Sequence, residues 1–185
     1  MTRCNEQVVK SLDDAEAATW QALATELAAE LGSLLLSGGW LVTTAESCTG
    51  GLIASAITEV AGSSAWFERA VVTYSNAAKQ SMLGVDEAIL HEHGAVSEAC
   101  VKAMARGALE RTDAHVAIAV SGIAGPDGAT PGKPVGTVWI GWVLATKNTV
   151  EAERFVFRGN RRDVREQAVC QALRGTILRI SDTGS

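Results

Sequence analysis

Basic residues are scarce in this sequence relative to acidic ones. The 16 Lys and Arg residues stand against 21 Asp and Glu, which gives a net charge of -5. Proteins that bind nucleic acid through its backbone need a basic surface, so the charge balance argues against a nucleic-acid partner. Long hydrophobic runs are also missing. The apolar runs 116–120 and 138–145 are far shorter than the roughly 18 residues that a membrane-spanning helix requires, and we expect no membrane partner.

Metal-binding patterns are absent as well. The four cysteines, at positions 4, 48, 100 and 170, have no paired short spacing, and the three histidines add no zinc pattern. We expect reduced thiols, no metal and no cofactor. The polar residues 1–14 do not resemble a secretory signal, so the cytoplasm is the expected location. Cys48 lies beside a Gly-rich turn and could be a nucleophile, but a lone cysteine is more often a small buried apolar residue.

The remaining pattern alternates helices with strands. Apolar residues at steps of three and four predict a helix from about 13 to 38, and similar signals predict helices near 52–60, from 75 or 76 onward, near 97–111 and near 160–177. Strands are predicted at 40–44, 70–74, 114–120, 136–145 and 151–157. A turn at 146–149 suggests that the last two strands form an antiparallel hairpin. Trp139 and Trp142 have opposite parity and should face opposite sides of the sheet.

This arrangement predicts an α/β fold. We expect a single-domain layered α/β/α sandwich with a mixed sheet of about five strands, because 185 residues suit one domain. The domain should span 17–180, with an N-terminal extension at 1–16 and a tail at 181–185. Ligands of such folds bind at the carboxyl ends of the central strands.

Common nucleotide and hydrolase motifs fail at those strand ends. The loop from Gly122 reads G-x-x-G-x-x-G, which differs from the dinucleotide fingerprint. Gly132-Lys133 lacks the upstream glycine and the following Ser or Thr of a P-loop. Ser47 lacks the flanking glycines of the α/β-hydrolase elbow, and no lysine has a serine three positions upstream, as β-lactamases do.

Ser47 nevertheless occupies a suggestive place, where a strand ends and a helix begins. The amides of Thr49, Gly50 and Gly51 should point towards the same space, because the first turn of a helix has unpaired N–H groups and a positive dipole end. That combination favours an oxyanion site beside a hydroxyl nucleophile. The alternative is that Ser47 or Thr49 simply caps the helix.

Lys79 and Tyr74 follow the next predicted strand. Lys79 lies in the first turn of a helix, where the dipole and burial would lower its pKa and allow a neutral amine to act as a base. Tyr74, the one tyrosine of the chain, could orient Ser47 or relay a proton. The alternatives are a surface charge and a half-buried strand aromatic.

A local basic cluster stands at the start of the last helix. Arg161, Arg162 and Arg165 follow the predicted cap Asn160, so a phosphate is the natural ligand there, with Arg161 the best placed. Solvated arginines on a helix face are common, which is the alternative. The glycines of the loop 122–128 either reverse the chain or let a ligand approach the backbone.

Four motifs together resemble the CinA C-terminal domain family, the nicotinamide-nucleotide amidase family, over about 17–180. The matching segments are Thr43-Thr44-Ala45-Glu46-Ser47-Cys48-Thr49-Gly50-Gly51, then Val72-Thr73-Tyr74-Ser75-Asn76 with Lys79, then His93-Gly94-Ala95-Val96-Ser97, and Ser121-Gly122-Ile123-Ala124-Gly125-Pro126. The resemblance implies a metal-free Ser-Lys amidohydrolase that converts nicotinamide mononucleotide to nicotinate mononucleotide and ammonia.

The resemblance also implies residue roles. Ser47 would be the nucleophile, Lys79 its base, Tyr74 an auxiliary hydroxyl and Arg161 a phosphate contact. The other substrate-binding candidates are Thr49, Gly50, Gly51, Ser121 and Gly122. Asn160 stands where an aspartate is expected. The likeness is to the stand-alone form of the family, and it implies a homodimer or homotetramer.

Two other classes of protein stay open on the sequence. A non-catalytic nucleotide-binding or protein-interaction module linked to competence would also need glycine loops and an arginine. A purely structural protein would leave the hydroxyl-rich and glycine-rich strand ends without a purpose.

Overall fold

The computed structural model describes residues 20–147 and 149–182 of the chain. Six α-helices, one short 3-10 helix and five strands follow one another within these residues. Their order and bounds are α2 (Trp20–Gly38), β1 (Val42–Glu46), α3 (Leu52–Thr58), η1 (Ser63–Ala65), β2 (Phe67–Val72), α4 (Asn76–Leu83), α5 (Glu87–His93), α6 (Glu98–Glu110), β3 (Val116–Gly122), β4 (Thr137–Leu144), β5 (Val150–Val156) and α7 (Arg161–Ser181).

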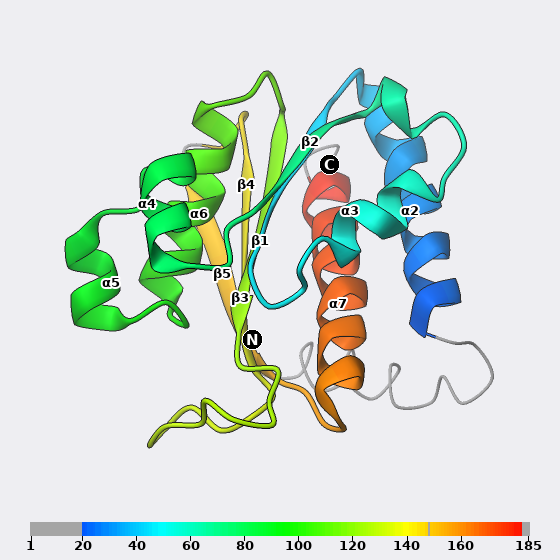
Figure 1. Cartoon of the computed structure of the whole chain (residues 1–185). Coiled ribbons are helices and arrows are strands. Elements are labelled where there is room, and N and C mark those ends of the chain that lie inside the picture. Colours follow the sequence, from blue (N-terminus) through cyan, green and yellow to red (C-terminus); the bar gives the residue numbers. More distant parts are fainter. Residues whose placement is uncertain (1–19, 148, 183–185) are drawn as a thin grey trace.

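The strands form one mixed sheet in the order β2-β1-β3-β4-β5. β1 pairs in parallel with β2 and β3, whereas β4 pairs antiparallel with β3 and β5. In Figure 1, α4, α5 and α6 cover one face of this sheet, and α2, α3 and α7 cover the other. The expected α/β/α sandwich with a mixed five-stranded sheet and a terminal hairpin is therefore confirmed.

Each face of the sheet has its own hydrophobic core. Apolar residues of α2, α3 and α7 meet alternate residues of the central strands, and α6 with the end of α4 meets the other set. β1 and β3 are buried on both faces, as central strands of a covered sheet should be. The two tryptophans of β4 do face opposite sides. Trp142 is buried and donates through Nε1 to the carbonyl of Ala172 in α7 (3.0 Å), whereas Trp139 packs against the α6 side.

The register of the parallel strands aligns three hydroxyl residues at one edge of the sheet. Glu46 of β1 pairs with Val72 of β2 and with Val120 of β3. The residues that follow this row are Ser47, Thr73 and Ser121. Their backbones continue the ladder for one step, because the Ser47 amide donates to the carbonyl of Val120 (3.0 Å) and the Thr73 amide to that of Glu46 (2.8 Å). The carboxyl ends of β1, β2 and β3 thus bring these three residues side by side.

Several boundaries differ from those predicted. Helix α5 (Glu87–His93) was not predicted from the sequence. Asp86 caps it by accepting from the Ala88 amide, and Gly94 follows its end. β2 begins at Phe67 and ends at Val72, so Tyr74 lies beyond the strand rather than at its end. The predicted beginning of the first helix at residue 13 lies outside the described residues.

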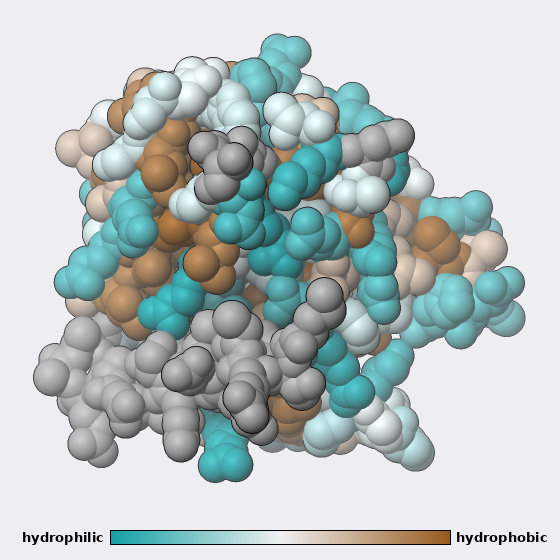
Figure 2. Space-filling view, turned by 180° about the vertical axis from the view of Figure 1, so that it is seen from behind, coloured by the Kyte–Doolittle hydropathy of each residue, from teal (hydrophilic) through white to brown (hydrophobic). Residues whose placement is uncertain are grey.

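The outer surface is mixed in character. Figure 2 shows hydrophilic and hydrophobic side chains side by side, with apolar ones gathered mainly on the half that carries α2 and α7, where Leu36 and Leu178 are exposed. Within 20–147 and 149–182, no helix combines the length and hydrophobicity needed to cross a bilayer.

Candidate active site

The turn between β1 and α3 is held by a buried carboxylate. Glu46 is fully buried, and its oxygens accept from the backbone amides of Gly51 (2.9 Å), Ile53 (3.2 Å) and Ala54 (2.9 Å). The side chain therefore caps α3 from the last residue of β1. Gly50 and Gly51 have φ of 61° and 95°, in the left-handed region that favours glycine, which lets the chain turn sharply between strand and helix. Ser47 is the first residue of this turn.

Ser47 and Lys79 meet in the structure. The Lys79 Nζ lies 3.2 Å from the Ser47 Oγ and donates to the carbonyl oxygen of Thr73 at 2.8 Å. Ser75 caps α4 by accepting from the Ala78 amide, so the helix places Lys79 one turn in, facing the sheet. The two side chains are 8% and 1% exposed, respectively. The strand-end register and the α4 cap thus bring a hydroxyl and an amine into hydrogen-bonding distance.

The surroundings of Lys79 favour its neutral form. Burial lowers the pKa of Lys79 below its usual 10.5. The two nearby thiols add no negative charge at neutral pH, because burial raises the pKa of Cys48 to about 12 and that of Cys100 to about 11. A neutral amine has two hydrogens and one lone pair, and the Thr73 carbonyl takes one of the hydrogens. The lone pair is then available to a proton on Ser47.

The amides of Gly50 and Gly51 do not point towards the Ser47 hydroxyl, although the sequence predicted that they would. Gly51 donates to Glu46, and Gly50 donates to the carbonyl of Ser47 (3.1 Å), so neither amide is free beside the hydroxyl. The physical reason is that the chain's own carboxylate already occupies the positive end of α3. The amides of Cys48 and Thr49 lie against the sulfur of Cys48, which is a weak acceptor. The buried Thr49 Oγ1 has no hydrogen-bond partner within the described part of the chain.

Tyr74 does not join the Ser47–Lys79 pair. Its side chain is 63% exposed and its hydroxyl lies 3.1 Å from Nη2 of Arg161, which donates to it. No hydrogen bond within the described residues links Tyr74 to Ser47 or Lys79. The same guanidinium donates through Nη1 to the carbonyl of Gly125 (2.8 Å). Arg161 therefore connects the loop after β3 to the segment after β2, and Tyr74 serves as its partner.

Ser121 and Gly122 end β3 beside this site. The buried Ser121 donates through Oγ to the carbonyl of Ala95 (2.7 Å), which fixes the segment between α5 and α6 against the strand. Gly122 passes so close to β4 that a Cβ there would lie 2.9 Å from the Thr137 carbonyl oxygen. A side chain at this position would therefore push the two strands apart.

The sequence reading missed the role of Arg165. Its Nε donates to the carbonyl of Cys48 (3.0 Å) and its Nη2 to that of Thr49 (2.8 Å), so α7 holds the backbone that directly follows Ser47. Cys48 itself is buried in the core, where its raised pKa keeps the thiol protonated. The reactive-cysteine alternative is therefore disfavoured. A basic residue one turn beyond Arg161 was the available signal for Arg165, but its carbonyl partners are 116 and 117 residues away.

Asn160 caps the helix that carries both arginines. Its side chain accepts from the amides of Arg162 (2.8 Å) and Asp163 (3.3 Å), and Asp163 accepts from the Asn160 amide (2.8 Å). Asparagine thus performs the expected capping here without a charge. Among residues 20–147 and 149–182, no three His, Cys, Asp or Glu side chains cluster in a way that could hold a metal ion.

Comparison with known families identifies the family of the chain. The family model of the CinA C-terminal domain matches residues 24–179. The chain belongs to this family. A "Nicotinamide-nucleotide amidohydrolase PncC" of Enterobacter agglomerans is 55% identical over 154 residues, which cover 83% of this chain and 93% of that relative. The Escherichia coli K12 protein of the same name is 53% identical over 148 residues, covering 80% and 89% of the two chains.

Other members of the CinA family are longer or have been solved as crystal structures. A "CinA-like protein" of Akkermansia muciniphila is 54% identical over 134 residues, but the match covers only 32% of its length. Solved structures of family members from Klebsiella pneumoniae and Agrobacterium tumefaciens both superimpose with a TM-score of 0.82 at 42% identity. The Klebsiella pneumoniae match covers 85% of this chain and 97% of that chain, and the Agrobacterium tumefaciens match covers 86% and 96%.

Proposed function

We propose that the chain is an amidohydrolase that converts nicotinamide mononucleotide and water to nicotinate mononucleotide and ammonia through a Ser47–Lys79 dyad. The observation that carries this proposal is the 3.2 Å contact between the Ser47 hydroxyl and a buried lysine amine whose pKa is lowered. The names of the curated relatives support the substrate and the reaction.

The first half of the reaction transfers the acyl group to the enzyme. Neutral Lys79 accepts the Ser47 proton while Oγ attacks the carboxamide carbon, and the carbonyl oxygen takes the negative charge. The amides of Cys48 and Thr49 are the donors left to stabilise that oxyanion, since Gly50 and Gly51 are engaged elsewhere. When the tetrahedral intermediate collapses, the C–N bond breaks, Lys79 returns its proton to the leaving nitrogen, and ammonia departs.

The second half restores the enzyme. Lys79 takes a proton from water, the hydroxide attacks the Ser47 ester, and the ester C–O bond breaks as Lys79 returns the proton to Oγ. Nicotinate mononucleotide is then released. No charge or atom is left over, and the chain's own residues supply every proton-transfer step. No metal or cofactor is needed for these steps.

Arg161 is the proposed contact for the substrate phosphate. It lies at the N-terminus of α7, its guanidinium is fixed by Gly125 and Tyr74, and the surrounding side chains leave it exposed. A phosphate there meets both the guanidinium and the positive end of a 21-residue helix. Tyr74 is proposed to orient Arg161, and Thr49 and Ser121 to line the space beside the dyad.

Ammonia release from nicotinamide mononucleotide tests the proposal. Ser47→Ala should lower kcat by about 10³-fold or more while the nucleotide still binds, as measured by calorimetry. Full turnover in this variant would refute the nucleophile. Binding without turnover in the wild-type chain would instead favour the alternative of a nucleotide-binding module.

The phosphate contact has its own test. Arg161→Ala should raise KM for nicotinamide mononucleotide roughly tenfold or more, because a hydrogen bond to a charged group contributes about 1.5–3 kcal/mol. Nicotinamide riboside, which lacks the phosphate, is the matched control and should be much less affected. Equal losses for both compounds would contradict the assignment. The proposed homodimer or homotetramer can be checked by light scattering of the same preparations.

A further inference from the structure

A cavity of about 360 Å³ lies behind the nucleophile turn, between α2, α3 and α7. It does not include Ser47 or Lys79. Its apolar wall includes Trp20, Leu52 and Val169, and its charged residues include Arg162, Arg165 and Glu166. The volume falls within the range of small-molecule sites, which are mostly apolar with a few polar groups.

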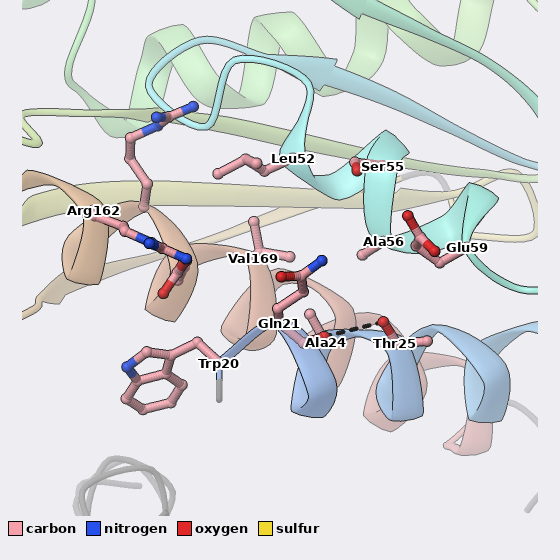
Figure 3. Close-up of a pocket in the computed structure, with 12 residues that line it drawn as sticks. Trp20, Gln21, Ala24, Thr25, Leu52, Ser55, Ala56, Glu59, Arg162 and Val169 are labelled. Carbon is pink, nitrogen blue, oxygen red and sulfur yellow. Dashed lines mark hydrogen bonds and ion pairs between the residues drawn. The ribbon is translucent and has the colours of Figure 1, made fainter. Parts of the chain in front are cut away.

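The cavity has charged groups at its ends and a mixed lining between them. Figure 3 shows Trp20 and Arg162 at one end and Glu59 at the other, with the apolar side chains of Leu52 and Val169 and the amide of Gln21 between. Thr25, which also faces the cavity, has its hydroxyl committed to the Gln21 carbonyl (3.0 Å). A ligand that fits must therefore lay an apolar face against Leu52 and Val169 and present a charged or polar group to one end.

The positive charge of Arg165 has no counterion among the described residues. Arg162 forms an ion pair with Glu166 (2.7 Å), but Arg165 donates only to the neutral carbonyls of Cys48 and Thr49. Its Nη1 has no acceptor within the described part of the chain. A half-buried guanidinium without a carboxylate partner is costly, and an anion in the cavity would neutralise it. Glu59 would repel the same anion from the opposite end.

We propose that this cavity binds a small molecule with a carboxylate on a planar apolar ring. The carboxylate pairs with Arg165, next to the Arg162–Glu166 pair, and the ring lies between Leu52 and Val169 near Trp20. Because Arg165 also holds the carbonyls of Cys48 and Thr49, the bound carboxylate touches the residue that positions the nucleophile turn. The site is distinct from the proposed site for nicotinamide mononucleotide.

Calorimetric titration with 2-naphthoate tests the site, with 2-naphthamide as the neutral control of the same ring. The Ser47→Ala chain without nicotinamide mononucleotide is used, so that failure of the proposed amidase reaction leaves the result unaffected. We expect 2-naphthoate to bind at least about tenfold more tightly than 2-naphthamide. Equal affinities, or no binding of either compound, would overturn the proposal.

Two variants locate the binding. Ser55→Phe should fill the cavity from α3 and weaken 2-naphthoate binding about tenfold or more, whereas Ser37→Phe, at an exposed position of α2 outside the cavity, should leave it unchanged. Arg165→Gln should remove the preference for the acid over the amide. Undiminished binding in Ser55→Phe, or displacement of 2-naphthoate by nicotinamide mononucleotide, would place the ligand elsewhere and reject the cavity.

Discussion

At the scale of single residues, the buried Lys79 makes the stability of the fold depend on pH. Burial lowers its pKa, so the unfolded chain holds the proton to higher pH than the folded chain does. The free energy of unfolding should therefore rise with pH until the usual value of 10.5 is reached. Lys79→Met removes this contribution, so the difference in stability between wild type and variant should move in favour of the wild type as the pH rises towards 10.5.

Chemical denaturation at several pH values measures that difference. Ser47→Ala retains the buried amine and is the control, which should follow the wild-type trend. The rate of the wild type should rise along a limb that lies below pH 10.5, as Lys79 loses its proton. A stability difference independent of pH would show that Lys79 has the same pKa folded and unfolded.

Glu46 is the second residue whose replacement is informative. Glu46→Gln keeps the shape but turns an NH₂ group towards amides that need an acceptor. We expect a loss of about 1–3 kcal/mol in unfolding free energy and a lower kcat with little change in KM, because the turn that positions Ser47 loosens. Glu59→Gln, at the exposed end of the same helix, should change neither. A variant with lower stability but normal kcat would limit Glu46 to capping α3.

At the scale of elements, α4 depends on a glycine in α6. A Cβ on Gly107 would collide with the carbonyl oxygen of Leu83, at the end of α4. Gly107→Ala should therefore displace α4 or strain α6, at a cost of about 1–3 kcal/mol, and should reduce turnover because α4 carries Lys79. Arg106→Ala, at an exposed neighbouring position, is the control for helix propensity. Stability and ammonia release of the two variants can be compared directly; normal turnover in Gly107→Ala would uncouple this packing from the site.

Most of the helices and strands could be predicted from the sequence. Strands β1, β3 and β4 and helices α4, α6 and α7 follow from apolar periodicity and from caps such as Ser97 and Asn160. The seven-residue α5 was missed because it is too short to display that periodicity. The place of Ser47 and Lys79 at adjoining strand ends was predicted, since parallel strands bring their carboxyl ends to one edge.

Hydrogen bonds between residues far apart in the sequence could not be predicted from local spacing. Glu46 reads as an ordinary charged residue of a motif, and only the folded turn shows that its carboxylate takes the amide of Gly51. Tyr74 pairs with Arg161, 87 residues away, rather than with the dyad. The contacts of Arg165 with Cys48 and Thr49 likewise cross from the last helix to the turn that follows β1. Local spacing carries no information on such pairs.

At the scale of the whole molecule, the dyad spans two layers of the sandwich. Ser47 belongs to the turn that leads into α3 on one face of the sheet, and Lys79 belongs to α4, which packs with α6 on the other face. Turnover is therefore sensitive to the docking of both layers, whereas helical ellipticity reports only that the helices persist. In a urea titration, ammonia release should decline at lower urea than ellipticity at 222 nm. Coincident curves would show that the layers separate only when the whole chain unfolds; earlier inactivation would make this amidase assay a sensor of partial opening that circular dichroism does not detect.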